Sequence, residues 1–369
     1  MKTDQYSLLK EKLSSKAFSS IFVLVDDNTD KFCLDIFIKK TKIKEFNKIT
    51  INSGEQNKNI DTCLIIWDKL NAFNADRKSL LINLGGGVLT DLGGFVASTY
   101  LRGISFINIP TTLLGMVDAA HGGKTGIDFK LLKNQIGLFS DPLDVILDSG
   151  YLSTLTKDEF LNGYAEVFKH SLLTNKKDLN FNSLIKLDFY KDVTFIIEKY
   201  SEIKKEIVES DKLESNQRKV LNLGHTIGHA VESYSYMTTS LNELKHGEAI
   251  IVGLITELYI SHKQLNFPKE DLENIKKTFS EYFNMVSFSD KDVEQIYDLM
   301  IYDKKNEADK LNFVLLKEIG TPVIDQQVTK ELFVEGSPKI CTKSFLLVEF
   351  TCIFLVLFAN SHNNLIHRV

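Results

Sequence analysis

The chain has 369 residues, of which 43% are hydrophobic and 25% are charged, a composition typical of a globular protein with a substantial core. With only 5 prolines and 20 glycines, it is neither fibrous nor of low complexity as a whole. The formal net charge of −5 provides no general attraction for phosphate backbones, so we expect no nucleic-acid partner.

The N-terminal segment and the cysteines favour a cytoplasmic protein. Residues 1–20 mix polar and apolar side chains and lack the apolar stretch of a secretory signal. Cys33, Cys63, Cys341 and Cys352 show no CxxC spacing, which argues against a disulfide framework and against a thiolate metal site. We therefore expect a reducing, cytoplasmic location.

Residues 20–115 alternate short β-rich runs with helical patterns. The runs read IFVLVD, KITIN, SLLINLGGG and ISFINIPTT, and a helical pattern covers Ile60–Phe73. Alternation of this kind is typical of parallel strands joined by crossover helices. We predict that residues 1–150 form an α/β domain with a mostly parallel sheet.

A glycine-rich turn, LGGGVLTD at Leu84–Asp91, follows the run SLLIN and opens a helix towards Tyr100. Glycines at such a junction let backbone N–H groups approach a pyrophosphate, and the helix N-terminus adds partial positive charge. The turn is therefore a candidate dinucleotide cradle. It lacks the GxGxxG spacing, and a plain strand-to-helix connection is the alternative.

Polar side chains follow three of the predicted strands. Asp26 and Asn28 follow the first, Ser53–Lys58 follows the second, and Thr111 and Thr112 follow the strand FINIP. Open α/β sheets bind ligands at the carboxyl ends of their strands, so these side chains are candidates for contacts to ribose or base. Each of them alone can also be a turn or cap residue.

The pattern changes at about Lys157, after which apolar residues recur every three to four positions. We predict a mainly helical domain over residues 151–335 and a separate segment at 336–369. Phe345–Ala359 in that segment is apolar, but it contains Glu349 and is shorter than a membrane-spanning helix requires. A packed tail, or an end unrelated to function, is favoured over membrane contact.

Histidines and carboxylates in the helical part form a candidate metal site. His225 and His229 lie four residues apart and share one helix face, with Glu232 one turn further on. His246 and Glu166 are further candidates. A set of His and Glu without Cys suits a catalytic divalent ion with an open coordination position, most simply Zn²⁺. For each histidine the alternative is a hydrogen-bonded residue without metal.

Basic and amide residues beside these segments predict an anion pocket, because Lys and Arg form charge-assisted hydrogen bonds with phosphate and carboxylate. Taken singly, most such residues are solvated surface charges. Arg218 and Asn222 lie one turn apart and one turn before His225, so an anion held there would touch the metal site. The other members are Lys124, Lys133, Asn134, Lys169 and Lys204.

Taken together, the motifs resemble those of the 3-dehydroquinate synthase family, which belongs to the sugar phosphate cyclases. The matching stretches run in the family's order from about residue 20 to about residue 325: GGGVLTDLGGFVASTYLRG, IPTTLLGMVDAAHGGKTGIDF, KNQIGLF, YAEVFKH, RKVLNLGHTIGHAVE, HGEAI and DKKN. The resemblance implies an α/β NAD-binding domain followed by a helical metal- and substrate-binding domain. It also implies a cytoplasmic homodimer of the shikimate pathway.

The resemblance further implies residue roles. Glu166, His225 and His246 would bind the metal, Zn²⁺ or Co²⁺, and His229 would lie near the reacting hydroxyls without being a ligand. The substrate, a phosphorylated sugar acid, would contact Asp118, Lys124, Asn134, Lys169, Lys204, Arg218, Asn222 and Lys304, with Arg102 reaching in from a partner subunit. NAD would contact Asp26, Asn28, Glu55, Lys58, Gly86, Gly87, Val88, Asp91, Thr111, Thr112, Lys124, Lys133, Tyr151 and Thr154.

The family's reaction converts 3-deoxy-D-arabino-heptulosonate 7-phosphate into 3-dehydroquinate and phosphate, through transient oxidation by NAD, phosphate elimination, re-reduction and aldol closure. The chain departs from the family at Ala119-Ala120-His121 and at His170, and neither departure removes a charged group that the chemistry requires. The alternatives are another sugar phosphate cyclase, a metal-dependent glycerol or alcohol dehydrogenase of the same architecture, and a catalytically silent homologue. The anion pocket favours the synthase over a dehydrogenase.

Overall fold

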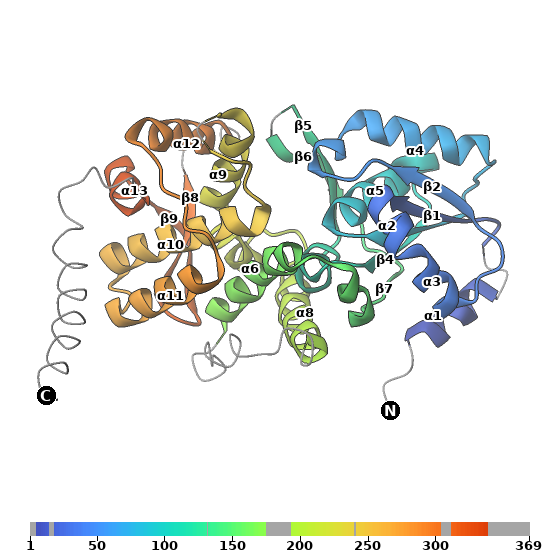
Figure 1. Cartoon of the computed structure of the whole chain (residues 1–369), viewed down its shortest axis with the longest axis horizontal. Coiled ribbons are helices and arrows are strands. Elements are labelled where there is room, and N and C mark those ends of the chain that lie inside the picture. Colours follow the sequence, from blue (N-terminus) through green and yellow to red (C-terminus); the bar gives the residue numbers. More distant parts are fainter. Residues whose placement is uncertain are drawn as a thin grey trace, which may run out of the picture.

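The structure is a computed structural model, and it describes residues 5–14, 18–130, 132–174, 193–239, 241–303 and 311–338. Figure 1 shows an elongated molecule, with the sheet-containing N-terminal part at one end and a mainly helical part at the other. The α/β class with a helical second part, predicted from the sequence, is confirmed.

A five-stranded parallel sheet forms the centre of the N-terminal part. Its order is β2 (Asn47–Ile51), β1 (Ile21–Asp26), β3 (Leu80–Gly85), β4 (Ser105–Pro110) and β7 (Asp144–Val145). Its inner strands are apolar runs because helices cover both faces. The four β-rich runs of the sequence correspond to β1 to β4.

Helices pack on both faces of this sheet. One face carries α4 (Ile60–Ala72) and α5 (Gly87–Thr99), whose apolar residues share a core with β1, β2 and β3. The opposite face carries α1 (Gln5–Ser14), α2 (Asp27–Phe32) and α3 (Leu34–Thr41). The core on this second face continues into the helical part, so a single apolar cluster joins the two ends of the molecule.

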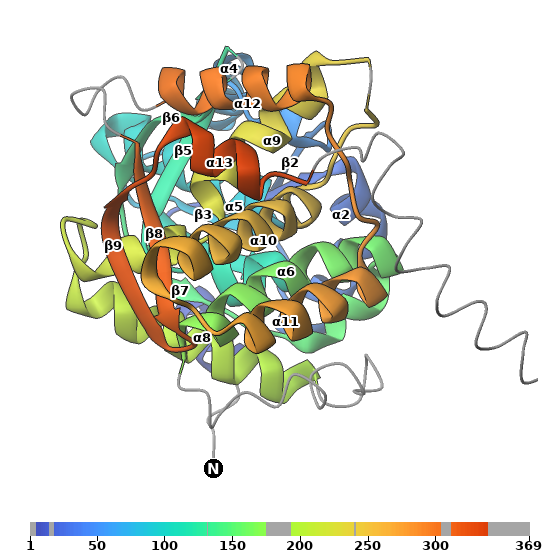
Figure 2. The same ribbon diagram turned by 90° about the vertical axis from the view of Figure 1, so that its left-hand side faces the viewer.

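The helical part is built around α10 (His246–Leu265). Figure 2 shows α10 between α11 (Lys269–Tyr282) and α12 (Asp290–Asp303), with a β-hairpin along one side. The remaining helices are α6 (Lys157–Leu173), α8 (Val193–Ser210), α9 (His225–Met237) and α13 (Lys330–Gly336). Short helical turns occur along the whole described chain, and one of them, η6 (Gln217–Asn222), lies between α8 and α9. The others precede α6: η1 (Glu55–Asn57), η2 (Tyr100–Arg102), η3 (Gly115–Ala119) and η4 (Ser149–Thr154).

Two antiparallel hairpins were not predicted. The first is β5 (Lys124–Phe129) with β6 (Leu132–Phe139), and the second is β8 (Asn312–Glu318) with β9 (Thr321–Gln327). β6 is largely solvent-exposed, so it lacks the buried run that marks a strand. Residues 313–316, by contrast, form an apolar run that is buried against α10.

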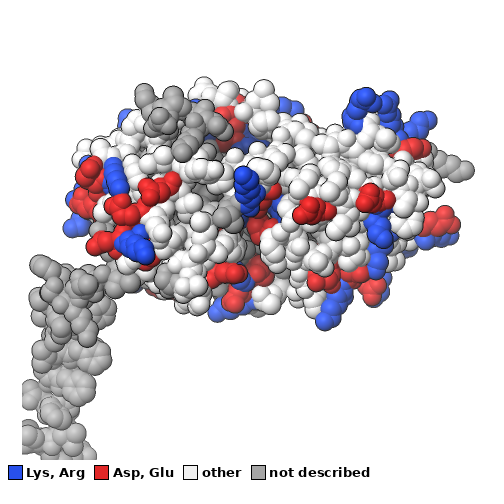
Figure 3. All heavy atoms as spheres, turned by 90° about the horizontal axis from the view of Figure 1, so that it is seen from above, with Lys and Arg blue, Asp and Glu red and all other residues white. Residues whose placement is uncertain are grey.

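Acidic and basic side chains are interspersed over the described surface in Figure 3. Within the described ranges, no helix combines the length and apolarity that crossing a bilayer requires. The apolar stretch Phe345–Ala359 and Lys304 lie outside those ranges. The chain division at about residue 150 stays a prediction.

Candidate active site

Three side chains from three helices converge between α6, α9 and α10. Glu166 lies in the buried middle of α6, while His225 and His246 are the first residues of α9 and α10. The Nε2 atoms of His225 and His246 lie 3.6 and 3.4 Å from Glu166 Oε1. The proposed ligand atoms of all three lie within 4.8 Å of one another. The structure thus brings together the predicted metal set.

A close helix crossing brings the two histidines together. A Cβ on Gly253 of α10 would overlap the carbonyl oxygen of Gly224, and a Cβ on Gly228 would lie 2.7 Å from Ile250 Cδ1. Gly224 caps α9 with a φ of +79°, in the left-handed region that favours glycine. Glycine at these positions therefore allows α9 and α10 to approach closely enough for His225 and His246 to face Glu166.

The donors fit a divalent metal ion. Glu166 Oε1 is buried and forms no hydrogen bond within the described part of the chain. The Nδ1 atom of His225 lies 3.1 Å from the Leu223 carbonyl oxygen, and the Nδ1 atom of His246 lies 3.1 Å from Glu232 Oε2. These contacts leave each Nε2 facing Glu166, as outer-shell partners of metal-binding histidines do. Two imidazoles and one carboxylate form a donor set of catalytic zinc sites.

The electrostatics of this triad differ from residue to residue. Burial alone would raise the pKa of Glu166, but Lys169 and then His225 hold it well below its usual range. Burial, followed by Lys169, lowers the pKa of His225 to about 3, so the ring is neutral. For His246, burial is outweighed by Glu232 and Glu166, which raise its pKa to about 9. A metal ion bound to this ring would therefore displace a proton from it.

Asp118 is the centre of a second charged cluster beside the triad. Its Oδ1 atom lies 2.9 Å from Lys204 Nζ, 3.2 Å from His170 Nε2 and 3.4 Å from Lys169 Nζ. Lys169 Nζ is also 2.5 Å from Glu166 Oε2. Asp118, Lys169 and Lys204, all predicted as substrate contacts, therefore form one ion-pair network with Glu166, a predicted metal ligand. The Lys169 ammonium lies between the carboxylates of Asp118 and Glu166.

Three other predicted anion ligands meet at a residue that the sequence analysis missed. Lys124 contacts the carboxylate of Glu214, Asn222 Nδ2 donates to Glu214 Oε1 over 2.7 Å, and Arg218 Nε lies 3.9 Å from Glu214 Oε2. Glu214 precedes Arg218 by four residues, a spacing that could have indicated the pair. The buried Arg218 guanidinium also donates to the carbonyl oxygens of Lys212 and Gly122, at 2.6 and 2.8 Å.

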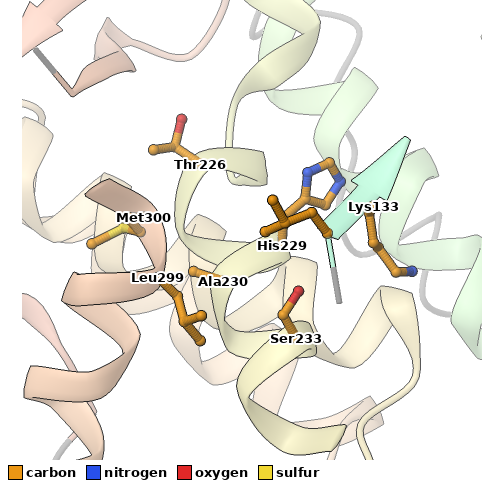
Figure 4. A pocket seen from close by; sticks show the side chains of 8 residues that line it. Lys133, Thr226, His229, Ala230, Ser233, Leu299 and Met300 are labelled. Atoms are coloured by element: carbon orange, nitrogen blue, oxygen red, sulfur yellow. The ribbon is translucent and has the colours of Figure 1, made fainter. Parts of the chain in front are cut away.

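His229 lies beside the triad. Its ring centroid is 5.2 Å from that of His225 and 5.9 Å from that of His246. Burial, together with these two rings, lowers the pKa of His229 well below its usual range. Figure 4 shows the small pocket next to it, where Lys133 of β6 lies beside α9.

We call the region at the carboxyl ends of β1 and β3 the cofactor crevice, because open α/β sheets bind dinucleotides at such a place. In the sheet, β2 lies on one side of β1 and β3 lies on the other, so the order of the strands reverses between β1 and β3. Open α/β sheets bind their ligands at the carboxyl ends of the two strands on either side of such a reversal. Asp26 and the turn at Gly86 and Gly87 lie there. A Cβ on Gly87 would be 3.1 Å from Ala119 Cβ, so the turn packs against the residue after Asp118. Asp26 Oδ1 also caps α2, accepting from Thr29 N at 2.7 Å.

Charged residues cross the mouth of this crevice. Lys58 Nζ donates to Asp91 Oδ2 over 2.7 Å and to Asn134 Oδ1 over 2.6 Å. Lys133 Nζ lies 3.0 Å from Glu55 Oε1. Asn134 is predicted as a substrate contact, but its side chain bonds to Lys58, a predicted NAD contact. It does not join the other predicted anion ligands that surround Glu214.

The remaining predicted contacts lie around the same sheet edge or apart from the site. Thr111 is buried after β4, and Thr154 Oγ1 donates to the Tyr151 carbonyl oxygen over 2.7 Å. Asn28 is exposed. Arg102 is exposed at the end of η2, and its predicted place in a partner's site stays a prediction.

Comparison with known proteins gives a consistent result. The family model for the 3-dehydroquinate synthase N-terminal domain matches residues 48–162, and the C-terminal model matches residues 163–306. A 3-dehydroquinate synthase of Parabacteroides distasonis is 41% identical over 337 residues, covering 90% of this chain and 94% of that protein. One from Campylobacter jejuni is 35% identical over 339 residues, covering 90% and 95%.

Solved structures share the fold at lower identity. A 2-epi-5-epi-valiolone synthase from Streptomyces hygroscopicus, with NAD⁺ and Zn²⁺ bound, has a TM-score of 0.77 and 24% identity, covering 88% of this chain and 91% of that one. A 2-deoxy-scyllo-inosose synthase complexed with carbaglucose-6-phosphate, NAD⁺ and Co²⁺ has a TM-score of 0.77 and 23% identity, covering 89% and 93%. An iron-containing alcohol dehydrogenase has a TM-score of 0.57 and 16% identity, covering 87% and 90%.

Proposed function

Because this chain belongs to the 3-dehydroquinate synthase family, we propose that it is a phosphate-eliminating cyclase. It converts 3-deoxy-D-arabino-heptulosonate 7-phosphate into 3-dehydroquinate and inorganic phosphate. The observation that carries this proposal is the continuity of the site: the glycine turn packs on Ala119, and Asp118 is linked through Lys169 to Glu166. A hydride acceptor, a metal and a group of cations would therefore act on one small substrate.

The cofactors are NAD and a divalent metal, most simply Zn²⁺, with Co²⁺ also suited to the donors. When bound, NAD supplies a reversible hydride acceptor, and the metal supplies a Lewis acid for the hydroxyl oxygens of the substrate. Glu166, His225 and His246 hold the metal. Asp26, the turn from Gly86 to Asp91 and the residues at the crevice mouth hold NAD.

The chain's own charges position the substrate. Lys169 keeps Glu166 ionised, and Asp118 holds the ammonium groups of Lys169 and Lys204 in place. Lys204 and Arg218 bind the substrate carboxylate. Lys124, Asn134, Lys304 and Arg102 of a partner subunit bind the phosphate. Asn222 contributes to the same anion pocket.

His229 is assigned to the substrate hydroxyls. Its imidazole lies beside both histidine ligands, so it can exchange a proton with a hydroxyl oxygen held there. We further propose that the enzyme works as a homodimer in the cytoplasm, in which the exposed Arg102 at the end of η2 reaches the site of the partner subunit.

A stoichiometry assay tests the function. Protein loaded with Zn²⁺ and given NAD⁺ in far smaller amount than the heptulosonate phosphate should release one phosphate per substrate without accumulating NADH. Steady NADH accumulation would identify a dehydrogenase instead. If the protein turns over a sugar phosphate that lacks a carboxylate and does not turn over the heptulosonate phosphate, it is a different cyclase.

A further inference from the structure

A chain of four charged side chains runs from the mouth of the cofactor crevice to the metal triad. Glu55 Oε1 lies 3.0 Å from Lys133 Nζ, and Lys133 Nζ lies 2.5 Å from Glu232 Oε1. The other oxygen of the same carboxylate, Glu232 Oε2, lies 3.1 Å from His246 Nδ1. His246 Nε2 then faces Glu166.

These groups are shielded from water. The side chain of Glu232 is 2% exposed and that of Lys133 is 12% exposed, so their attraction is weakly screened. Lys133 Nζ lies between two carboxylates, so opposite charge holds this ammonium on both sides.

The chain also joins the two ends of the molecule. Lys133 belongs to β6, which packs on the sheet-containing part, whereas Glu232 and His246 belong to α9 and α10 of the helical part. The two oxygens of one planar carboxylate are shared between Lys133 and His246. A shift of the Lys133 ammonium therefore turns this carboxylate and changes the hydrogen bond that orients the His246 ring.

We propose that Lys133 and Glu232 are positioning residues that couple the NAD subsite to the metal site, so that each ligand strengthens the binding of the other. This inference rests on the proposed function, since it requires that NAD binds at Glu55 and Lys133 and that the metal binds at His246. A cofactor hydroxyl held by Glu55 fixes the Glu55 and Lys133 side chains, and Lys133 in turn fixes Glu232. By thermodynamic linkage, metal binding then raises the affinity for NAD by the same factor.

The test measures Zn²⁺ affinity by competition with a chromophoric chelator, with and without saturating NAD⁺. In the unaltered protein, NAD⁺ should tighten Zn²⁺ binding. Lys133→Met, although Lys133 contacts none of the three ligands, should weaken Zn²⁺ binding by about 10- to 100-fold, as loss of an outer-shell partner does. It should also abolish the effect of NAD⁺. Glu232→Gln should weaken binding similarly, and the double variant should be no weaker than the single ones.

The matched control is Lys263→Met, which removes a lysine at the other end of α10 whose partner, Glu335 Oε1 at 2.8 Å, is separate from the ligands and from the predicted NAD contacts. Its Zn²⁺ affinity without NAD⁺ should equal that of the unaltered protein. Lys133→Arg, which keeps the charge, should restore most of the affinity and guards against a folding defect in Lys133→Met. Unchanged Zn²⁺ affinity in Lys133→Met or in Glu232→Gln would overturn the coupling.

The two proposals fail in different ways. If the unaltered protein neither retains Zn²⁺ nor turns over the heptulosonate phosphate, the proposed function is wrong. If it does both, and Lys133→Met still binds Zn²⁺ tightly with an undiminished NAD⁺ effect, only the coupling is wrong.

Discussion

Buried charge dominates the site at the scale of single residues. Asp118 lies against two ammonium groups, those of Lys169 and Lys204, and the side chain of Lys169 is 1% exposed. Burial would raise the pKa of Asp118, but Lys169 and Lys204 hold it well below its usual range. This carboxylate therefore stabilises the folded protein above about pH 4, and the stabilisation is lost as the pH falls through the folded-state value.

Asp118→Asn should consequently cost stability. The substitution keeps the shape but leaves two buried ammonium groups without their shared anion, and breaking such a pair costs about 3–5 kcal/mol. Urea unfolding at pH 7 measures the loss. Asp141→Asn is the control, because its pair with Lys212 is exposed and pairs of that kind contribute about 0–1 kcal/mol. Equal stability of the two variants would contradict the central place given to Asp118.

The choice of His246 rather than His229 as the third proposed metal ligand could not be made from the spacing alone. The i, i+4 spacing indicated that His225 and His229 share a face, but left open whether both bind one ion. In the folded chain, the contact of His246 with Glu232 and of His225 with the Leu223 carbonyl turns these two rings towards Glu166. Glu214 was missed because its contacts with Lys124 and Asn222 form only once the chain has folded.

The α9 and α10 crossing is the decisive feature at the scale of elements. Gly253→Ala places a methyl group against the Gly224 carbonyl, so the helices have to separate. We expect weaker Zn²⁺ binding together with a loss of stability of about 1–3 kcal/mol, typical of overpacking. Chelator competition and urea unfolding measure the two effects.

Val252→Ala serves as the matched comparison for Gly253→Ala. It removes buried volume from the adjacent position of α10 and leaves the crossing intact. It should lower stability while retaining Zn²⁺ affinity. A parallel loss of Zn²⁺ affinity in both variants would show that stability, not helix spacing, controls the metal site.

The β5–β6 hairpin was not predicted, and it contains a titratable group. Burial raises the pKa of Asp128 to about 6, and its Oδ1 accepts from Asn134 N at 2.8 Å. When the pKa of a carboxyl group is higher in the folded than in the unfolded protein, the group stabilises the fold at a pH below its unfolded-state pKa. This stabilisation is lost as the pH rises through its folded-state pKa. The difference in unfolding free energy between Asp128→Asn and the unaltered protein should therefore shift in favour of the variant as the pH rises from about 4 to about 7. A difference in unfolding free energy that stays constant over this range would contradict the assignment.

At the scale of the whole molecule, the parallel sheet follows from the sequence pattern more readily than the joining of the two ends. Apolar runs separated by a helical pattern predicted a parallel sheet, because strands covered on both faces must be apolar. The single core that links the sheet to α6, α8 and α10 was not predictable, since it depends on which helix faces meet. The same holds for the charge network, whose members Glu55 and His246 are far apart in sequence.

Deleting residues 340–369 should leave catalysis largely intact. The described ranges up to residue 338 contain the proposed metal ligands and most of the proposed substrate contacts, and the family models end at residue 306. We expect kcat/KM for the heptulosonate phosphate to stay within about twofold, equivalent to less than about 0.5 kcal/mol of transition-state binding. A large loss of activity or of cooperative unfolding in the shortened protein would assign the tail to the fold.

The central claim is that a metal held by α6, α9 and α10 lies beside the cofactor crevice. Anomalous scattering at the zinc edge, from crystals grown with Zn²⁺ and NAD⁺, tests it most directly. The account predicts one strong peak at about 2.0–2.2 Å from Nε2 of His225, Nε2 of His246 and a carboxylate oxygen of Glu166, with the cofactor along the turn at Gly86. A zinc peak elsewhere, with these three side chains unbound, would contradict it.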